Sequence, residues 1–181
     1  MRSPSGKSLR RKAHRNIKSL GIGIGKATVA NYLEYLSDSM IFYPLRPYVK
    51  SYKLQEKMGF KPYLVDNGLL KVMGVEDDGR LLENLIFTEL IKRGHEPNED
   101  LFYYVTRNGK EVDFLIKGKE LIQVTAELHE KNYEREIKGL IEASKELGIK
   151  KLIVVTLEQD EILNVRGREV VVISLRKWLL V

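Results

Sequence analysis

The sequence predicts an α/β protein of the α+β kind, in which a helix-turn-helix with a β-ribbon precedes a domain of order αβββαβ. Two observations favour this fold class. Apolar residues recur at helical spacing in some segments and form short strand-like runs between turn residues in others. The charge is also divided unevenly along the chain. Both patterns change near residues 74–79, so we expect two domains, residues 1–75 and 76–181.

The net charge of +6 belongs to the first of these domains. Residues 1–75 carry 14 basic and 4 acidic side chains, or +10, whereas residues 76–181 carry 17 and 21, or −4. Residues 1–26 hold eight basic residues and no acidic one. Such a run is either a solvated tail or a contact surface for phosphates or for an acidic protein partner.

The first domain is predicted to contain two helices and a β-ribbon. Leu9, Ala13, Ile17 and Leu20 predict a helix over 7–19, and the apolar spacing over 28–37 predicts a second helix. The glycine-rich stretch 21–25 separates them as a turn. The aromatic stretch 40–48 contains two prolines, which suits a β-ribbon or wing better than a central strand. This order predicts a winged helix-turn-helix.

The second domain begins with an amphipathic helix over 79–94. Three strands are expected next, over 102–105, 111–116 and 121–125, with turns at Asn108-Gly109 and Lys117-Gly118 between them. A long helix over 130–147 ends at Gly148 and leads to a strand over 151–156. A further strand over 169–173 and an apolar C-terminal segment, 178–181, complete the order αβββαβ with one more strand.

A winged helix-turn-helix with a basic arm predicts DNA binding. In this hypothesis the helix that begins near Lys26 enters the major groove, and the wing near Arg46 and Lys50 touches the backbone. Nucleic acid is then the expected partner. The expected DNA-binding residues are Arg10, Arg11, Lys12, Arg15, Lys18, Lys26, Thr28 and Asn31.

Composition excludes several other classes. The chain has no cysteine and only three histidines, which excludes disulfides, thiolate nucleophiles and zinc fingers. No apolar run is long enough for a membrane helix and no secretory signal pattern is present, so a cytoplasmic location is expected. The high charge is typical of thermophiles. The segment GIGIGKAT at 21–28 departs from a phosphate-binding P-loop, since it has one residue too few and Ala27 in place of the hydroxyl.

Two carboxylates indicate where chemistry could reside. Asp113 lies inside an apolar strand, where a carboxylate is costly unless it is paired or binds a cation. Glu83 lies in the first turn of the preceding helix. An acid on the first helix, an aspartate on the second strand and a polar pair on the third strand describe the PD-(D/E)xK, restriction-endonuclease-like nuclease core. There, oxygen ligands hold Mg²⁺ or Mn²⁺, which activates water against a phosphodiester.

The chain also resembles a known family over about residues 15–181. The resemblance is to the C-terminal half of prokaryotic, especially archaeal, AAA+ superfamily ATPases, where a winged helix precedes a PD-(D/E)xK nuclease-like domain of unknown function. It is carried by ATVANYLEYL at 27–36, KPYLVDNGL at 61–69, GRLLEN at 79–84, KEVDFLI at 110–116 and shorter matches up to Trp178-Leu179-Leu180. The Walker and sensor motifs of the ATPase half are not found in this sequence.

Carried over by that resemblance, Glu83 matches the helix acid, Asp113 the central metal ligand and Gln123 the acidic position of the third strand. Glu83, Asp113 and Gln123 are thus the candidate metal ligands. The nuclease E-x-K reads Gln123-Val124-Thr125 here, so an amide replaces the third carboxylate and Thr125 replaces the lysine. Compensation could come from Glu127 or from a cation of the next helix, for which the candidates are Lys131, Arg135 and Lys138.

Three interpretations remain open. The first is a DNA-binding protein with a degenerate nuclease-like domain, in which Asp113 is a structural carboxylate held by the backbone or by Arg135. The second is a Mg²⁺- or Mn²⁺-dependent nuclease that acts on branched DNA. The third is a protein-interaction module whose partner is an ATPase or another protein.

Overall fold

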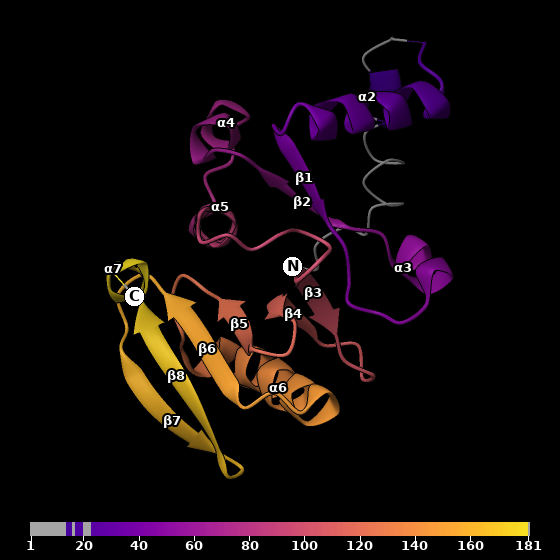
Figure 1. Cartoon of the computed structure of the whole chain (residues 1–181). Coiled ribbons are helices and arrows are strands. Elements are labelled where there is room, and N and C mark those ends of the chain that lie inside the picture. The colour runs from indigo at the N-terminus through magenta and orange to yellow at the C-terminus, as the bar shows by residue number, and fades with distance from the viewer. Residues whose placement is uncertain (1–13, 16, 20–22, 181) are drawn as a thin grey trace.

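The structure is a computed structural model, which describes residues 14–15, 17–19 and 23–180 (Figure 1). It is a mixed α/β protein. The helices are α2 (Lys26–Asp38), α3 (Tyr52–Met58), α4 (Asn67–Val72), α5 (Asp78–Lys92), α6 (Glu130–Leu147) and α7 (Leu175–Leu179). The strands are β1 (Phe42–Leu45), β2 (Lys61–Leu64), β3 (Leu101–Val105), β4 (Glu111–Ile116), β5 (Glu120–Val124), β6 (Lys151–Thr156), β7 (Glu161–Val165) and β8 (Arg168–Ser174).

The larger sheet has six strands in the order β3-β4-β5-β6-β8-β7. Strands β3, β4 and β5 form antiparallel pairs, as their hairpin-length connections require. Strands β5, β6 and β8 are parallel, and helix α6 makes the crossover from β5 to β6. Strand β7 pairs antiparallel with β8 at one edge.

Helices cover both faces of this sheet (Figure 1). On one face, α5 contributes Leu82, Ile86 and Phe87 to a core that contains Phe114 and Ile122 of the sheet. On the other face, the apolar stripe of α6 packs on residues such as Val112, Leu115 and Leu121. Gly139 permits the close approach of α6, because a Cβ there would lie 3.2 Å from the carbonyl oxygen of Glu111.

The smaller sheet pairs β1 with β2 in antiparallel register, with Leu45 opposite Lys61. Its residues Leu45 and Tyr63 belong to the same core as Leu82 and Phe87 of α5. The ribbon therefore packs on α5 rather than forming a separate core of its own. The boundary expected near residue 75 falls between elements that share this core, and it remains a prediction.

Most of the expected elements are confirmed. Helices α2, α5 and α6 and strands β3, β4, β5, β6 and β8 lie within two residues of their expected bounds. The helix expected over 7–19 lies largely outside the described residues, although the described residues 14–15 and 17–19 are helical. The sequence did not predict α3, α4, α7, β2 or β7. Within the described part of the chain, no helix has the length and apolar character needed to cross a membrane.

Candidate functional site

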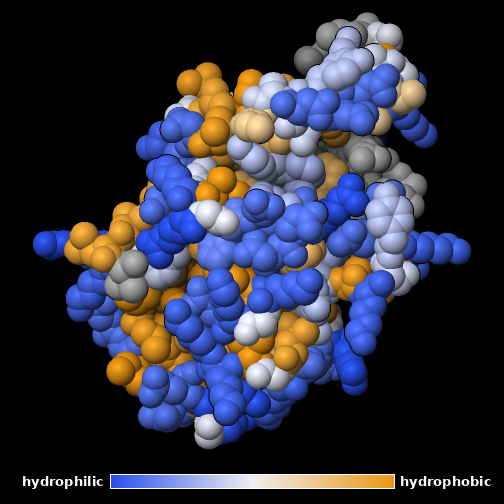
Figure 2. All heavy atoms as spheres, viewed as in Figure 1, coloured by the Kyte–Doolittle hydropathy of each residue, from blue (hydrophilic) through white to orange (hydrophobic). Residues whose placement is uncertain are grey.

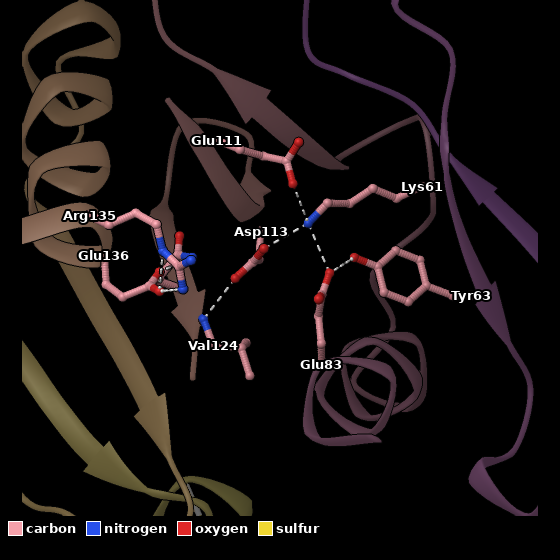
Figure 3. Close-up of polar contacts among 9 residues, drawn as sticks. Lys61, Tyr63, Glu83, Glu111, Asp113, Val124, Arg135 and Glu136 are labelled. Atoms are coloured by element: carbon pink, nitrogen blue, oxygen red, sulfur yellow. Dashed lines mark hydrogen bonds and ion pairs between the residues drawn. The ribbon is translucent and has the colours of Figure 1, made fainter. Parts of the chain in front are cut away.

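The ammonium group of Lys61 lies among three carboxylates (Figure 3). Its Nζ atom is 2.7 Å from Oδ1 of Asp113, 2.8 Å from Oε1 of Glu83 and 3.0 Å from Oε1 of Glu111. The Lys61 side chain is only 4% exposed and that of Asp113 only 9%. A lysine ammonium has three N–H donors and no acceptor, so three carboxylate neighbours match its full donor capacity.

Strand β2 places Lys61 in this cluster. Lys61 and Tyr63 alternate with less buried neighbours, so both side chains point toward α5 and β4. Asn84 of α5 fixes the position of the strand, since its side-chain oxygen accepts from the backbone N–H of Leu64 at 2.8 Å and its Nδ2 donates to the Leu64 carbonyl at 3.0 Å. The Tyr63 ring also stacks on Phe87, with centroids 4.2 Å apart.

A β-bulge in β4 turns Asp113 toward the same point. Phe102 pairs with Leu115 and Tyr104 with Val112, so two residues of β4 oppose the single residue Tyr103. A bulge of this kind redirects a side chain relative to the regular alternation. The carboxylate of Asp113 then reaches Lys61 through Oδ1 and accepts the backbone N–H of Val124 through Oδ2, at 2.9 Å.

The carboxylates keep Lys61 charged in spite of its burial. Desolvation alone lowers the pKa of a buried lysine, but Asp113, Glu83 and Glu111 outweigh it, so that the pKa of Lys61 is raised well above its ordinary value. Lys61 Nζ also lies 5.9 Å from the centre of the Tyr103 ring, a further favourable position for a cation. Lys61 is therefore a permanent cation of the site.

Burial raises the pKa of two acidic groups near Lys61, the Asp113 carboxyl and the Tyr63 hydroxyl. It raises the pKa of Asp113 to about 7; Lys61 opposes this shift and the nearby Glu83 adds to it. Burial, together with Glu83, raises the pKa of Tyr63 well above its ordinary value. The Tyr63 hydroxyl donates to Glu83 Oε1 at 2.6 Å, so Oε1 of Glu83 is shared between Tyr63 and Lys61.

The cluster resembles an oxygen-ligand metal site in its residue types but holds a side-chain cation. Magnesium requires oxygens at about 2.0–2.1 Å in octahedral geometry, whereas the distances to Nζ are those of hydrogen-bonded ion pairs. No group of three or more His, Asp or Glu side chains within the described residues has an arrangement that could hold a metal ion. The residues present do not fit Mg²⁺ or Mn²⁺ while Lys61 is in place.

The structure does not bring Gln123 to Glu83 and Asp113. Gln123 Nε2 donates to Oε2 of Glu136 on α6 at 2.8 Å, so its side chain lies on the opposite face of the sheet from α5. The third-strand positions that share the α5 face are Ile122 and Val124, both in its core. The bulge explains the difference, because it moves Asp113 out of step with Gln123. The expected ligand set is thus reduced to Glu83 and Asp113.

Thr125 lies beyond the end of β5 and caps a turn. Its hydroxyl donates to the carbonyl of Glu127 at 3.0 Å, and Asn132 Nδ2 donates to the same carbonyl at 2.7 Å. Thr125 therefore connects the strand to the start of α6. It has no contact with the carboxylate cluster among the interactions of the described residues.

Two of the compensating residues expected on α6 pair with other side chains. Arg135 forms an ion pair with Glu136, and Lys138 pairs with Glu134. The expectation that Asp113 is held by the backbone is confirmed by the Val124 N–H, but the cation that holds it is Lys61 and not Arg135. Within the described residues, Oε1 of Gln123 is buried without a hydrogen-bond partner.

The expected DNA-binding residues divide into two groups. Arg15, Lys18, Lys26, Thr28 and Asn31 are all exposed, the last three on α2. The remaining three, Arg10, Arg11 and Lys12, lie outside the described residues. His14 Nε2 lies 2.9 Å from the carbonyl oxygen of Ile24, which places the end of the basic segment next to the start of α2.

Sequence reasoning missed Lys61, Tyr63 and Glu111. Lys61 lies about 50 residues from Asp113 along the chain, and nothing in the spacing of the segment FKPYL links them. One signal was available, since Lys61 begins the KPYLVDNGL segment that carries part of the family resemblance. Lys61 also stands between apolar residues, where a buried charge needs a partner, as Asp113 does in its strand.

Comparison with known proteins gives two family matches and two curated relatives. A "Domain of unknown function (DUF8612)" matches residues 7–79 and a "Domain of unknown function (DUF4143)" matches residues 78–178. "Uncharacterized protein MJ1544" of Methanocaldococcus jannaschii is 44% identical over 134 residues, which cover 72% of this chain and 30% of that protein. An "Uncharacterized protein" of Haemophilus influenzae is 31% identical over 113 residues, which cover 59% of this chain and 27% of that protein.

The chain thus spans less than a third of the length of these relatives. No solved structure matches it. The match to residues 78–178 takes in α5, the whole six-stranded sheet and α6, together with Glu83, Glu111 and Asp113 of the cluster. Because this match covers more than half of the chain, the protein belongs to the DUF4143 family.

Proposed function

We propose that this protein binds DNA without cutting it. In this proposal the N-terminal part is a winged helix-turn-helix, and the rest is a degenerate PD-(D/E)xK, restriction-endonuclease-like domain. The observation that carries the binding is the exposed, acid-free first half of α2, with the exposed Arg15 and Lys18 close to its start. The proposed absence of cleavage is supported by Lys61, whose ammonium group pairs with Glu83 and Asp113, the two carboxylates that would otherwise be available to a metal.

The first half of α2 offers a surface suited to a DNA groove. Lys26, Thr28 and Asn31 are exposed, and Val29 is the buried residue that anchors the helix. In α2, whose residues are all described, acidic residues occur only at Glu34 and Asp38 in its second half. Thr28 and Asn31 are three residues apart and so lie on the same face. Their side chains can donate to phosphates or to base edges.

The N-terminal end of α2 also attracts phosphate. Its N-cap, Gly25, provides no side-chain hydrogen bond, so the free N–H groups of the first turn remain available. Arg15 and Lys18 are exposed close by, since His14 contacts Ile24 one residue before the N-cap. Together with Lys26 these residues supply positive charge at the end where the helix dipole is also positive.

The resemblance to the C-terminal half of archaeal-type AAA+ ATPases fits this proposal. The matched relatives are more than three times as long as the part they share with this chain. The two family matches meet at residues 78–79, close to the expected division into domains 1–75 and 76–181. We infer that this chain corresponds to the DNA-contacting portion of such proteins.

Fluorescence anisotropy with a labelled random duplex at several salt concentrations tests the proposal. Each phosphate contact contributes a slope of about −0.9 to log K against log salt. We expect a slope of about −3 or steeper for the wild type, and a shallower slope for Lys26→Ala. The matched control is Lys117→Ala, an exposed lysine in the β4–β5 turn. A wild-type protein that does not bind at low salt, or binds with a flat salt response, contradicts the proposal.

A second candidate function is protein binding, because an apolar surface is exposed at the other end of α2. Two backbone hydrogen bonds bring the residues of this surface together. The N–H of Ile41 donates to the carbonyl of Leu36, and the N–H of Val65, just before α4, donates to the carbonyl of Ile41. Figure 2 shows apolar residues gathered at the top of the molecule around α4 and α2. The surface comprises Leu36, Met40, Ile41, Val65, Leu69, Val72 and Met73.

Exposed apolar surface of this extent commonly marks an interaction site. The unmatched portion of the longer relatives supplies a candidate partner, whether ATPase or another domain. Binding of this chain to that portion of the Methanocaldococcus jannaschii relative, measured by calorimetry, tests the candidate. Val72→Asp should abolish binding, since Val72 is 87% exposed and its change does not disturb the core. Equal binding by the wild type and Val72→Asp contradicts this candidate.

A further inference from the structure

We propose that helix α3 and the residue just before its N-cap carry a second contact surface for the DNA backbone, formed by Lys50, Lys53 and Lys57. This inference rests on the proposed DNA binding and adds to it a site separate from α2. The ligand class is the phosphodiester backbone of duplex DNA. We call these three residues the α3 lysine surface.

The surface exists because the β1–β2 ribbon has no short turn. Strand β1 ends at Leu45 and β2 begins at Lys61, and the intervening segment folds into α3. The segment is fixed at its base, since Gln55 Nε2 donates to the carbonyl of Pro47 at 3.0 Å and the Ser51 side chain accepts from Leu54 N–H. It is therefore an ordered projection rather than a loose connection.

Helix α3 contributes nothing to the core. None of its residues, all of which are described, is buried, and Tyr52 and Leu54 are 69% and 44% exposed. A short helix that buries no apolar side chain gains little stability from packing, because most helical stability in proteins comes from a buried face. Its exposed side chains are thus available for a ligand.

The charge on this segment is mostly positive. Lys53 and Lys57 are four residues apart in α3, so helical spacing puts them on one side, and Lys50 is exposed just before the N-cap, Ser51. The acid of the segment, Glu56, faces Arg46 at 3.8 Å, and their charges offset each other. The three lysines therefore remain as uncompensated positive charge, with Tyr52 beside them as a hydroxyl donor for phosphate.

The position of α3 suits a duplex already held at α2. In Figure 1, α2 ends beside β1, and its opposite end, where the helix begins, lies on the same side of the molecule as α3. The apolar surface around α4 lies on the other side. Both basic surfaces can thus contact one duplex. Of the two wing residues that the sequence suggested, Lys50 belongs to the α3 lysine surface, whereas Arg46 pairs with Glu56.

Salt-dependent DNA binding tests the inference. The double variant Lys53→Ala/Lys57→Ala should reduce the magnitude of the salt slope by about 1.8, since two phosphate contacts are lost. The loss of affinity should be the same for duplexes of different sequence, because phosphate contacts carry no sequence information. The matched control is Lys117→Ala/Lys119→Ala, which removes two exposed lysines from the β4–β5 turn and should leave the slope unchanged.

The outcomes separate this inference from the proposed function. An unchanged slope for Lys53→Ala/Lys57→Ala, with a reduced slope for Lys26→Ala, overturns the α3 surface and leaves the α2 contact standing. An equal reduction in the Lys117→Ala/Lys119→Ala control also overturns it, since the effect is then one of net charge. Absence of DNA binding by the wild type overturns both. Thermal unfolding of each variant verifies that the fold is retained.

Discussion

The Nζ atom of Lys61 lies 2.7 Å from Oδ1 of Asp113, and both side chains are almost entirely buried. This contact joins the β1–β2 ribbon to the central sheet. It also gives Asp113 a cation that comes from the chain itself, so the carboxylate needs no metal to be tolerated in the core. The same contact thus accounts for the packing of the ribbon and for the burial of the Asp113 carboxylate.

Removal of the Lys61 charge should destabilise the fold strongly. Lys61→Met leaves the carboxylates of Asp113, Glu83 and Glu111 without their shared cation, and breaking a buried ion pair costs about 3–5 kcal/mol. Urea unfolding at pH 8 measures the change. The control is Lys177→Met, whose more exposed pair with Asp160 should contribute much less to stability. Equal effects of the two substitutions contradict the role assigned to Lys61.

Loss of the Tyr63 hydroxyl should have an intermediate effect. Tyr63→Phe keeps the stacking on Phe87 but removes the hydrogen bond to Glu83, and hydrogen bonds to charged groups are worth about 1.5–3 kcal/mol. Tyr104→Phe removes a similar bond to Glu146 at a less buried position. The unfolding free energy should fall more for Tyr63→Phe than for this matched control. A larger fall for Tyr104→Phe would contradict the stabilising role assigned to the buried Tyr63–Glu83 hydrogen bond.

Stability should depend on pH through Asp113. Its pKa is about 7 in the folded protein and about 3.9 in an unfolded chain, so between these values the folded state binds more protons. The free energy of unfolding of the wild type, relative to Asp113→Asn, should therefore fall as the pH rises from about 4 to 7. The slope is at most about 1.4 kcal/mol per pH unit for one proton.

Urea unfolding of the wild type and Asp113→Asn at four pH values in this range measures the difference. The asparagine retains an oxygen to accept the Val124 N–H, which isolates the effect of the charge. A difference that grows in favour of the wild type as the pH rises indicates that Lys61 lowers the pKa of Asp113, contrary to the expectation.

Introducing the E-x-K residues of a nuclease on the third strand should not produce cleavage. Gln123→Glu/Thr125→Lys recreates E-x-K in the sequence, but Gln123 faces Glu136 on the α6 side of the sheet. The new carboxylate would lie next to Glu136 and destabilise the fold by about 1–3 kcal/mol. A nuclease assay and urea unfolding test both expectations. A gain of Mn²⁺-dependent cleavage shows that the assigned face is wrong.

The sequence was sufficient for the elements whose pattern is local. Strands β4 and β6 and helix α6 have bounds that match the expected ranges, because alternation, turn residues and Gly148 define them within a few residues. Strand β2 was missed because its four residues are too few to show the alternation typical of a strand, and only its pairing with β1 defines it. Strand β7 was missed because its residues are mostly exposed and do not form an apolar run.

The site was predictable only in part. Glu83 and Asp113 do lie together, as an acid in an apolar strand suggested. Gln123 does not join them, because a single bulged residue in β4 changes which side of the sheet Asp113 faces, and periodicity cannot reveal a bulge. Lys61 could not be linked to Asp113 because the contact depends on the packing of the ribbon against α5.

The most direct measurement combines binding and cleavage in one experiment. Labelled duplex and flapped DNA are incubated with the wild type or Asp113→Ala, in EDTA or in Mn²⁺, and each sample is run on native and denaturing gels. We expect a shifted complex in both EDTA and Mn²⁺, with intact DNA in every lane. Cleavage by the wild type in Mn²⁺ that is absent from Asp113→Ala would contradict it.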